Sequence, residues 1–443
     1  MADPVLTVAE RLRPTFAKIA GGQESDPVVR RSDRADAQVN GSLALAKVLG
    51  KTPQEVAQMV LDAADLSAVC SATEIAGPGF INITFSNSFL ASELAVAAAD
   101  SRLGVRLSPA PEVVDIDYSA PNVAKEMHVG HLRSTVIGDA LVRMLEFVGH
   151  RVIRENHIGD WGTPFGMLIE HLIDLGEAEA ANELSVGDLD SFYRQARTKF
   201  DASDEFKERA RARVVLLQGG DDETLRMWKL LVGESTRYFD RVYRVLDVLL
   251  TSDDIMGESA YNHLLPEVVE RLKKSGMLQT SDGAEVVFVD GFVNRDNEPL
   301  PLIIRKTDGG YNYATSDLAC VIDRVERLGA TRILYVVGAP QAQHLEMVGV
   351  VSRKAGWVPE TTQMVHVAFG NVLGNDRKIL KSRSGEVVKL DALLTEAVER
   401  AGTSVREKNA ELSAEQQSEI ARQVGIGAIK YADLSTDRIK DYV

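Results

Sequence analysis

Two histidines, three positions apart, are the residues of this sequence best suited to chemistry on a phosphate. His128 and His131 enclose Val129 and Gly130. Imidazole nitrogens can donate hydrogen bonds to an anion, and a glycine lets a ring or a phosphate approach the backbone closely. The motif lies between a β-branched run and a long helical pattern, which is typical of phosphate sites in α/β folds. The alternative interpretation is a pair of solvated surface histidines.

The segments on either side of the pair must hold it in place. The run from Val113 to Tyr118 predicts a strand, and apolar residues recurring every three or four positions from Leu132 to Val148 predict a helix that Gly149 closes. His128 and His131 then lie at or just before the first turn of this helix. Backbone amides and the helix dipole both favour an anion there.

A longer block around the histidines is more specific than the pair itself. Residues 117 to 131 read DYSAPNVAKEMHVGH, and the pattern continues in Gly159-Asp160-Trp161-Gly162, Met256-Gly257-Glu258-Ser259, Tyr313-Ala314-Thr315-Ser316-Asp317 and Lys430-Tyr431-Ala432-Asp433-Leu434. These segments resemble arginyl-tRNA synthetases of class I, and the resemblance covers nearly the whole chain. The histidine motif matches the class signature, with Val in place of the usual Ile.

The resemblance implies a doubly wound, Rossmann-like parallel α/β sheet with a helical insertion, preceded by a small α+β domain. We expect an N-terminal tRNA-contacting domain at 1–108, a catalytic domain at 109–400 with the insertion at about 176–300, and a helical segment at 401–443 that begins an anticodon-binding domain. Local signals agree with this order: a capping box at Thr52 to Glu55, an alternating strand at 80–85, strand signals near 302–305 and 332–337, and a second capping box at Ser413 to Gln416 that opens a helix to about Leu434.

Resemblance assigns ATP to the histidine motif, with His128, Gly130 and His131 on one side of the nucleotide. The opposite side in this class is a Lys-Met-Ser-Lys-Ser loop, for which this chain has the degenerate stretch from Lys378 to Gly385. The alignment of this stretch with the family loop is open: either Lys381 or Arg383 is the residue that faces the phosphates. Lys125, three residues before the first histidine, has the spacing of a lysine that supplies the missing charge in such family members. Without the family argument, the same loop reads as solvated basic surface.

Arginine needs a carboxylate, because its guanidinium is planar, always charged and best held by two parallel hydrogen bonds. Asp317 is the leading candidate, and Tyr313 lies four residues before it where a helix begins. On local evidence alone, Asp317 could equally stabilise that helix through its dipole. The resemblance adds Asn122, His128, Glu258 and Gln341 to the arginine site. In the Gly-Asp-Trp-Gly block we expect Trp161 to anchor the core and Asp160 to cap the helix that follows.

Composition describes an ordinary globular protein of 443 residues with 45% apolar residues and a formal net charge of −15. This charge opposes indiscriminate coating of nucleic acid, so any RNA contact must use a local basic face. Cys70 and Cys320 are too few and too far apart for a zinc cluster, and we expect both to be buried and apolar in character, with no metal site. No segment has the length of a membrane span or the apolar core of a signal peptide, so we expect a cytoplasmic protein.

The resemblance implies ATP-dependent ligation of L-arginine to its tRNA through an arginyl-adenylate, with Mg²⁺ accompanying ATP, by a monomer. Two alternatives stay open on the sequence: a paralogue that passes activated arginine to another acceptor, and a catalytically silent RNA-binding module. Family members continue beyond the Lys430 to Leu434 region into the anticodon-binding domain, and this sequence stops at Val443. We therefore expect weak or absent charging of tRNA by this chain alone.

Overall fold

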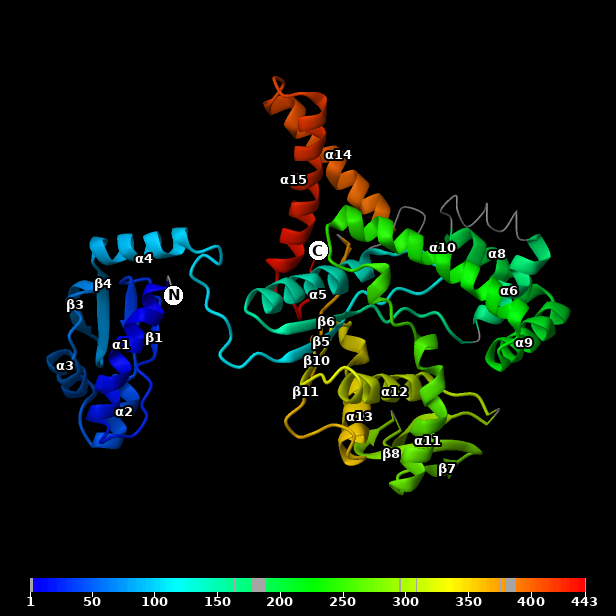
Figure 1. The fold of residues 1–443 in the computed structure, drawn as a ribbon, viewed down its shortest axis with the longest axis horizontal. Coiled ribbons are helices and arrows are strands. Elements are labelled where there is room, and N and C mark those ends of the chain that lie inside the picture. The colour runs from blue at the N-terminus through cyan, green and yellow to red at the C-terminus, as the bar shows by residue number, and fades with distance from the viewer. Residues whose placement is uncertain are drawn as a thin grey trace. The chain divides into compact units, whose positions relative to one another are not determined.

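The computed structural model describes residues 3–162, 164–176, 189–294, 296–307, 309–374, 376–378 and 388–442. It divides the chain into two compact units, one of residues 1–109 with 147–149 and one of 110–146 with 150–443 (Figure 1).

The N-terminal unit is an antiparallel sheet of order β1-β2-β4-β3 with four helices. Its elements are α1 (Pro4–Ile19), β1 (Val29–Arg30), β2 (Ala37–Val39), α2 (Ser42–Leu49), α3 (Pro53–Ala63), β3 (Cys70–Ala76), β4 (Phe80–Phe85) and α4 (Asn87–Ala99). The predicted strand at 80–85 is confirmed. So is the capping box, because Thr52 accepts the backbone N–H of Glu55 and the Glu55 carboxylate accepts that of Thr52.

The second unit is built on a parallel four-stranded sheet, which confirms the predicted fold class. Its strands, in the order β11-β10-β5-β6, are Gln363–His366, Arg332–Tyr335, Val113–Asp117 and Arg151–Glu155. The helix α5 (Val129–Phe147) connects β5 to β6, as the periodicity predicts. Because all four strands are parallel, their carboxyl ends meet at one edge, where ligands of open α/β sheets bind.

Alternating residues of β5 face different layers. Val114 and Ile116 belong to the core that includes α5, whereas Asp115 and Asp117 face Arg324 of α12 (Tyr313–Glu326). The guanidinium of Arg324 is 1% exposed and also donates to Glu155 of β6 at 2.6 Å. Burial raises the pKa of Asp115 well above its ordinary value. This network fastens α12 to the adjacent strands β5 and β6.

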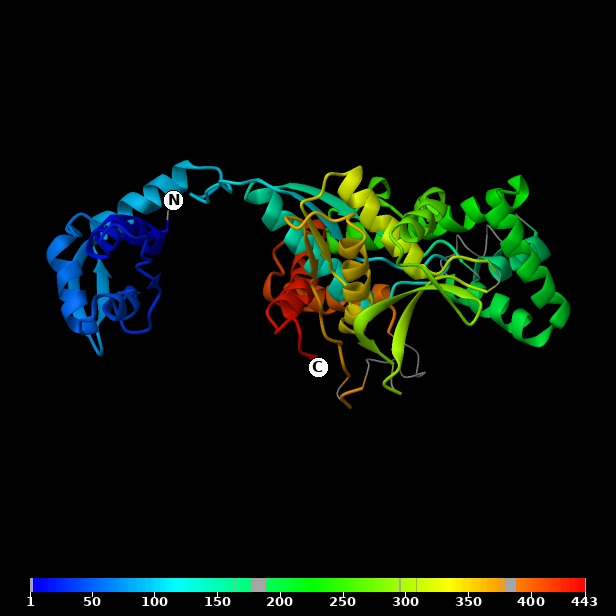
Figure 2. The ribbon, with the colours of Figure 1, turned by 90° about the horizontal axis from the view of Figure 1, so that it is seen from below.

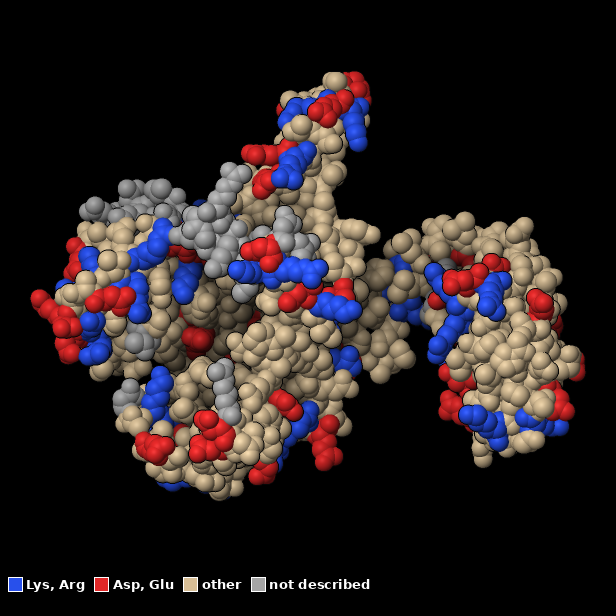
Figure 3. Space-filling model, turned by 180° about the vertical axis from the view of Figure 1, so that it is seen from behind, with Lys and Arg blue, Asp and Glu red and all other residues tan. Residues whose placement is uncertain are grey.

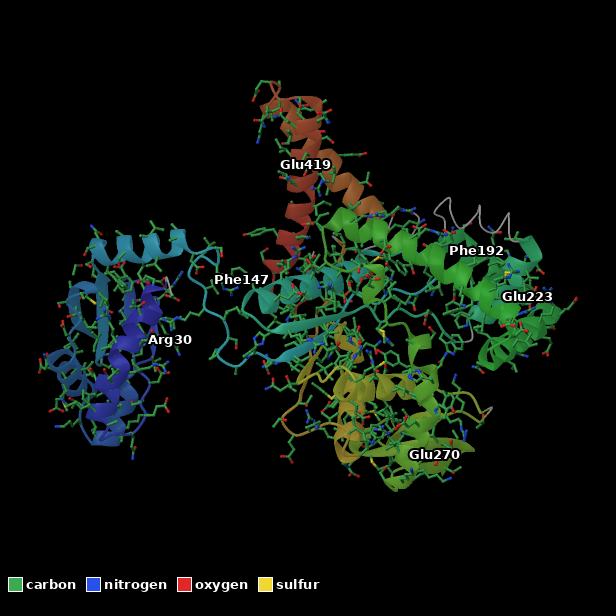
Figure 4. The ribbon with its side chains drawn as sticks, viewed as in Figure 1. Arg30, Phe147, Phe192, Glu223, Glu270 and Glu419 are labelled. Carbon is green, nitrogen blue, oxygen red and sulfur yellow. The ribbon has the colours of Figure 1, made fainter. Side chains whose placement is uncertain are left out.

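Four helices of the described part of the chain follow β6 and pack together at one end of this unit in both ribbon views (Figure 1 and Figure 2). They are α6 (Pro164–Leu175), α8 (Leu189–Ala202), α9 (Asp204–Gly219) and α10 (Asp222–Leu246). Phe192, labelled in Figure 4, is fully buried in their core. The helices are also joined by charge, because Arg209 and Arg213 of α9 both donate to the buried carboxylate of Glu170 of α6.

A separate antiparallel sheet follows the helices, in the order β7-β8-β9 (Gln279–Ser281, Ala284–Val293 and Pro299–Arg305). The strand signal near 302–305 is confirmed, and its strand, β9, belongs to this antiparallel sheet rather than to the parallel one. A short apolar run does not identify its partner strands. This sheet packs with η2 (Glu258–Leu264), α11 (Leu265–Lys274), α12 and α13 (Ala342–Lys354) around a second core.

The C-terminal region is a pair of helices, α14 (Leu390–Lys408) and α15 (Ala414–Leu434). The capping box predicted at Ser413 to Gln416 and the end at Leu434 are both confirmed. No helix among the described residues is long and apolar enough to cross a membrane.

Candidate active site

The two histidine rings stack at the start of α5. Their centroids lie 4.0 Å apart with the planes tilted by 33°. The Nδ1 atom of His131 accepts the backbone N–H of His128 at 3.1 Å, and the Nδ1 atom of His128 accepts that of Gly130 at 3.0 Å. Both Nδ1 atoms are thus acceptors, so in the neutral rings the proton is on Nε2. A Cβ at Gly130 would meet the His128 ring at 2.7 Å, which explains the need for glycine.

Burial keeps these rings neutral. It lowers the pKa of His131 to about 3 and that of His128 below its ordinary value, and Lys125 contributes in the same direction to both. The pair therefore offers hydrogen-bond donors rather than positive charge. Such donors suit phosphate oxygens at any pH near neutrality.

The loop that leads into the histidines is held by the helical insertion. The hydroxyl oxygens of Ser235 and Tyr238 accept the backbone N–H groups of Ala124 and Met127, and the Asp190 carboxylate accepts that of Glu126. Three non-glycine residues of the loop, Ser119, Ala120 and Ala124, have positive φ angles of 72°, 46° and 58°. Such backbone costs about 1–3 kcal/mol per residue and persists only where its surroundings enforce it.

Of the cationic residues predicted to lie around the motif, the structure describes one. The Lys125 ammonium lies 4.4 Å from the centroid of the Tyr193 ring, a cation–π contact with α8. Lys381 and Arg383 lie outside the described residues. The segment after them returns to the motif, because the Val129 N–H donates to the Val388 carbonyl and the Leu390 N–H donates to that of Met127. Residues 388–390, which follow the basic loop in the sequence, therefore lie beside the histidine motif.

One extended segment connects the histidine loop to the predicted arginine residues. Residues 156–160 continue β6 and pair on one side with residues 121–123, through the Val123 N–H to Gly159 carbonyl bond of 3.0 Å. On the other side they pair with residues 255–258, through the Glu258 N–H to Ile158 carbonyl bond of 3.1 Å. The backbones of residues 121–123 and 255–258 are therefore separated by two strand spacings, or roughly 10 Å. A nucleotide and an amino acid can meet across this span.

Glu258 lies among other carboxylates. The pKa of Glu258 is raised to about 7, mainly by burial; the negative charges of Asp160 and Asp317 act in the same direction, and His157 acts against it. Among the described residues, no Lys or Arg side chain forms an ion pair with Glu258 or Asp317. The His157 imidazole, whose pKa is raised well above its ordinary value, offsets only part of this negative charge. Half-buried carboxylates that lie together without a Lys or Arg partner are unfavourable. The cluster is therefore complementary to a cation.

Asp317 lies on the second turn of α12, on the same face as Tyr313. Its Oδ2 atom is 2.5 Å from Nε2 of His344, and the Tyr313 ring packs edge-on against the same imidazole at 4.9 Å. His157 and Cys320 complete the surroundings, with Nδ1 and Sγ 4.0 Å apart. Sequence reasoning missed His157 and His344. His157 lies just beyond the carboxyl end of β6, and this position was the available signal. His344 lies in the first turn of α13, which follows β10 and η3.

Two predicted arginine-site residues are exposed. Asn122 forms the backbone bridge with Gly159, and its Oδ1 atom occupies the space that a Cβ of Gly159 would need. Gln341 ends the short helix η3 (Ala339–Gln341), which follows β10. Both positions lie at the carboxyl edge of the sheet, from which their amides can reach a ligand.

The prediction for Asp160 was wrong. Its carboxylate does not cap the following helix but accepts the backbone N–H of Ser259 at 2.8 Å and the Ser259 hydroxyl at 2.6 Å. It thereby caps η2, the helix that begins at Glu258, from a distant part of the chain. Trp161 packs against the core and meets Trp228 edge-on at 5.8 Å, as expected of an anchor. Cys320 is buried, and Cys70 is only half-buried.

Comparison with known proteins identifies the family. Residues 94–443 match the family described as "tRNA synthetases class I (R), catalytic domain", and residues 7–85 match "Arginyl tRNA synthetase N terminal domain". The arginine–tRNA ligase of Thermobifida fusca is 53% identical over 445 residues, which cover 100% of this chain and 77% of that protein. The chain belongs to the arginyl-tRNA synthetase family. It is thus an enzyme of the class I aminoacyl-tRNA ligases.

Further relatives agree with this membership. The arginine–tRNA ligase of Yersinia enterocolitica is 49% identical over 432 residues, covering 96% of this synthetase and 75% of that protein. Among solved structures, the arginyl-tRNA synthetase of Plasmodium falciparum has a TM-score of 0.79 at 26% identity, covering 99% of this chain and 75% of that chain. That of Thermus thermophilus has a TM-score of 0.75 at 20% identity, covering 99% and 76%, and shows the same fold.

Proposed function

We propose that this synthetase ligates L-arginine to its tRNA in an ATP-dependent reaction, and that the residues described above divide the two substrates between them. His128 and His131 bind the phosphates through their Nε2–H donors, and Gly130 admits the nucleotide. Lys125, Lys381 and Arg383 supply positive charge around the same phosphates. The observation that carries the proposal is the half-buried Glu258 carboxylate, which has other carboxylates beside it and no described Lys or Arg partner.

The guanidinium of arginine completes the carboxylate cluster. Glu258 and Asp317 accept its N–H groups, Tyr313 and His344 fix the orientation of Asp317, and amides of the exposed Asn122 and Gln341 hold the remainder of the amino acid. A lysine ammonium offers a point charge and no planar fork, so it leaves buried acceptors unpaired. A site of this kind discriminates by orders of magnitude.

Activation joins the arginine carboxylate to the α-phosphorus of ATP and expels pyrophosphate, giving arginyl-adenylate. The protein forms no covalent bond in this step. It aligns the carboxylate oxygen in line with the leaving pyrophosphate and stabilises the charge that develops on the phosphates. A terminal ribose hydroxyl of tRNA then attacks the adenylate carbonyl, and AMP leaves.

Mg²⁺ enters with ATP in this proposal. Within the described ranges, the group of side chains able to hold a metal is His157, Asp317 and Cys320. A thiol and an imidazole do not fit Mg²⁺, which takes oxygen ligands. The phosphate oxygens fit it, and bound Mg²⁺ would neutralise their charge.

The RNA partner must approach a chain of net charge −15. On the face in Figure 3, Lys and Arg side chains are interspersed with Asp and Glu over both units, so contact with tRNA depends on local basic groups. The matched N-terminal domain, residues 7–85, is the proposed tRNA-contacting module. The domain boundaries, a monomeric state and a cytoplasmic location stay predictions.

The test is arginine-dependent exchange of pyrophosphate into ATP, run with and without tRNA. We expect exchange with arginine and none with lysine. His131→Asn should weaken binding of ATP, and Glu258→Gln should weaken binding of arginine, each without affecting the other substrate. Binding of each substrate can be measured by calorimetry even if turnover is slow. Equal loss of both affinities in either variant would contradict the proposed division of the site.

A further inference from the structure

A carboxylate, a thiol and an imidazole meet beside the proposed arginine site. Asp317 and Cys320 lie three residues apart on α12 and therefore on neighbouring positions of one helix face. His157, in the extension of β6, lies beside them, with its Nδ1 atom 4.0 Å from Sγ of Cys320. One nitrogen, one oxygen and one sulfur atom of the three side chains all lie within 4.8 Å of one another. Three different donor atoms thus converge on one point.

This set of donor atoms selects the kind of cation that can bind. Thiolate and imidazole ligands suit Zn²⁺ and similarly soft ions, whereas Mg²⁺ takes oxygen ligands. In a tetrahedral zinc site with bonds of about 2.0–2.3 Å, the ligand atoms lie roughly 3.3–3.7 Å apart. Since the atoms here are within 4.8 Å of one another, the longest separation must shorten by roughly 1 Å. Small rotations of the side chains achieve this, and water can take the fourth position.

Two further residues hold these side chains in place. The Nε2 atom of His344 donates to Oδ2 of Asp317 at 2.5 Å, and the Met256 carbonyl accepts a hydrogen bond from Nδ1 of His157 at 2.8 Å. Outer partners of this kind usually orient the ligands of protein metal sites. A neutral imidazole can bind a metal through one ring nitrogen while the other keeps the proton. The support that a metal site needs is therefore present.

The surroundings favour a cation at this point. Glu258 and Asp160 add negative charge to that of Asp317, and no described Lys or Arg side chain forms an ion pair with Glu258 or Asp317. Cys320 is buried, but His157 and Asp317 are only half-buried. An ion can therefore reach the three side chains from solvent. Once bound, it occupies the same carboxylate that the guanidinium of arginine needs.

We propose that His157, Asp317 and Cys320 form a binding site for Zn²⁺ or a cation of similar softness, and that the bound metal excludes arginine from Asp317. The Cys320 thiol releases its proton to the buffer when its sulfur binds the metal. The bound metal prevents activation of arginine without contacting the histidine motif. The competition with arginine rests on the proposed function, whereas the metal site does not.

Calorimetry measures the binding of Zn²⁺, with Mg²⁺ for comparison, to the full chain. The chain carries no polyhistidine tag and ATP is left out, because both would bind zinc themselves. Cys320→Ser removes the thiolate with little change in volume, and Cys70→Ser, which changes the half-buried cysteine of the N-terminal unit, is the matched control. Arginine affinity is measured with and without Zn²⁺. Thermal unfolding verifies folding, and His157→Gln replaces Cys320→Ser if that variant does not fold.

We expect one zinc ion per chain, bound about tenfold or more weakly by Cys320→Ser and within roughly twofold of the parent by Cys70→Ser. Saturation with zinc should weaken arginine binding by about tenfold or more, because one hydrogen-bonded carboxylate is lost. The metal site is overturned if the parent binds no zinc, binds Mg²⁺ as tightly, or binds zinc no better than folded Cys320→Ser. Unchanged arginine affinity in the zinc-bound chain overturns the competition.

Asp317→Asn separates this inference from the proposed function. We expect this variant to bind both zinc and arginine more weakly than the parent. Weaker zinc binding with undiminished arginine binding refutes the arginine site at Asp317 and leaves the metal site standing. Weaker arginine binding with undiminished zinc binding refutes the metal site and leaves the proposed function standing.

Discussion

Glu258→Gln tests the carboxylate cluster through its dependence on pH. The pKa of Glu258 lies near 7 in the unliganded protein, against an ordinary 4.5. A bound guanidinium favours the ionised carboxylate and returns the pKa to 4.5 or below. Arginine binding should therefore release a proton, and its affinity should fall as pH drops below 7. Between pH 8 and pH 6 the expected loss is about tenfold, because at pH 6 about nine in ten sites must first lose a proton.

The same shift has a consequence for stability. In the unfolded chain Glu258 ionises near 4.5, but in the folded protein it does so only near 7. Glu258 therefore does not lower the free energy of unfolding below pH 4.5 and lowers it by the full amount above pH 7. At about 1.4 kcal/mol per pH unit, the full amount is about 3 kcal/mol. An amide cannot ionise. Glu258→Gln should raise the free energy of unfolding by up to this amount at pH 8 and by little at pH 5.

Calorimetry in buffers of different ionisation enthalpy measures the released proton, and urea unfolding at pH 5 and pH 8 measures the stability. The matched control is Glu346→Gln on the exposed face of α13, which removes the same charge outside the cluster. We expect Glu258→Gln to abolish the pH dependence of arginine affinity between 6 and 8, and Glu346→Gln to retain it. A tenfold pH effect that survives in Glu258→Gln would refute the reasoning, as would a variant less stable than its parent at pH 8.

Three further predictions concern other parts of the site and fold. Asp317→Asn should weaken arginine binding about ten- to a hundredfold, the value of one hydrogen bond to a charged group, with ATP binding unchanged in the same calorimetric assay. NMR of the imidazole rings should show no titration of His131 between pH 5 and pH 8, since burial lowers its pKa to about 3; a ring that gains a proton in that range would contradict the neutral donor assigned to it. Gly166→Ala on α6 should cost about 1–3 kcal/mol in urea unfolding, because its Cβ would clash with the facing helix α9. Gly233→Ala on α10, where the Cβ meets nothing within 4 Å, is its control and should be neutral or stabilising.

The elements that could be predicted from sequence carry their signals locally. The helix after the histidines, the capping box at Thr52 and the helix that ends at Leu434 each depend on spacing and caps within one segment, and each is confirmed. The strand at 302–305 was also found, but its sheet was not, because pairing partners are a long-range property. The same limit applies to Asp160, whose acceptor role for Ser259 spans 99 residues.

The candidate site was predicted best where a motif identified it. His128, His131, Glu258 and Asp317 follow from the family resemblance, whereas His344 and His157 follow only from the packing of α13 and the β6 extension around Asp317. Periodicity predicted the strand at 113–118 but not that its two aspartates bind a buried arginine. Arg324 and Arg133 read as ordinary charged residues on helices. Their burial depends on partners 169 and 300 residues away.

The insertion that holds the histidine loop also sets an order of events during synthesis. The backbone N–H groups of Ala124 and Met127 each donate to a hydroxyl oxygen that is synthesised 111 residues later. At a translation rate of 5–20 residues per second, the nascent loop spends roughly 5 to 20 seconds without those partners. Its positive-φ backbone cannot be enforced in that interval. The loop before the histidines therefore matures later than its own strand and helix, once α10 has been synthesised.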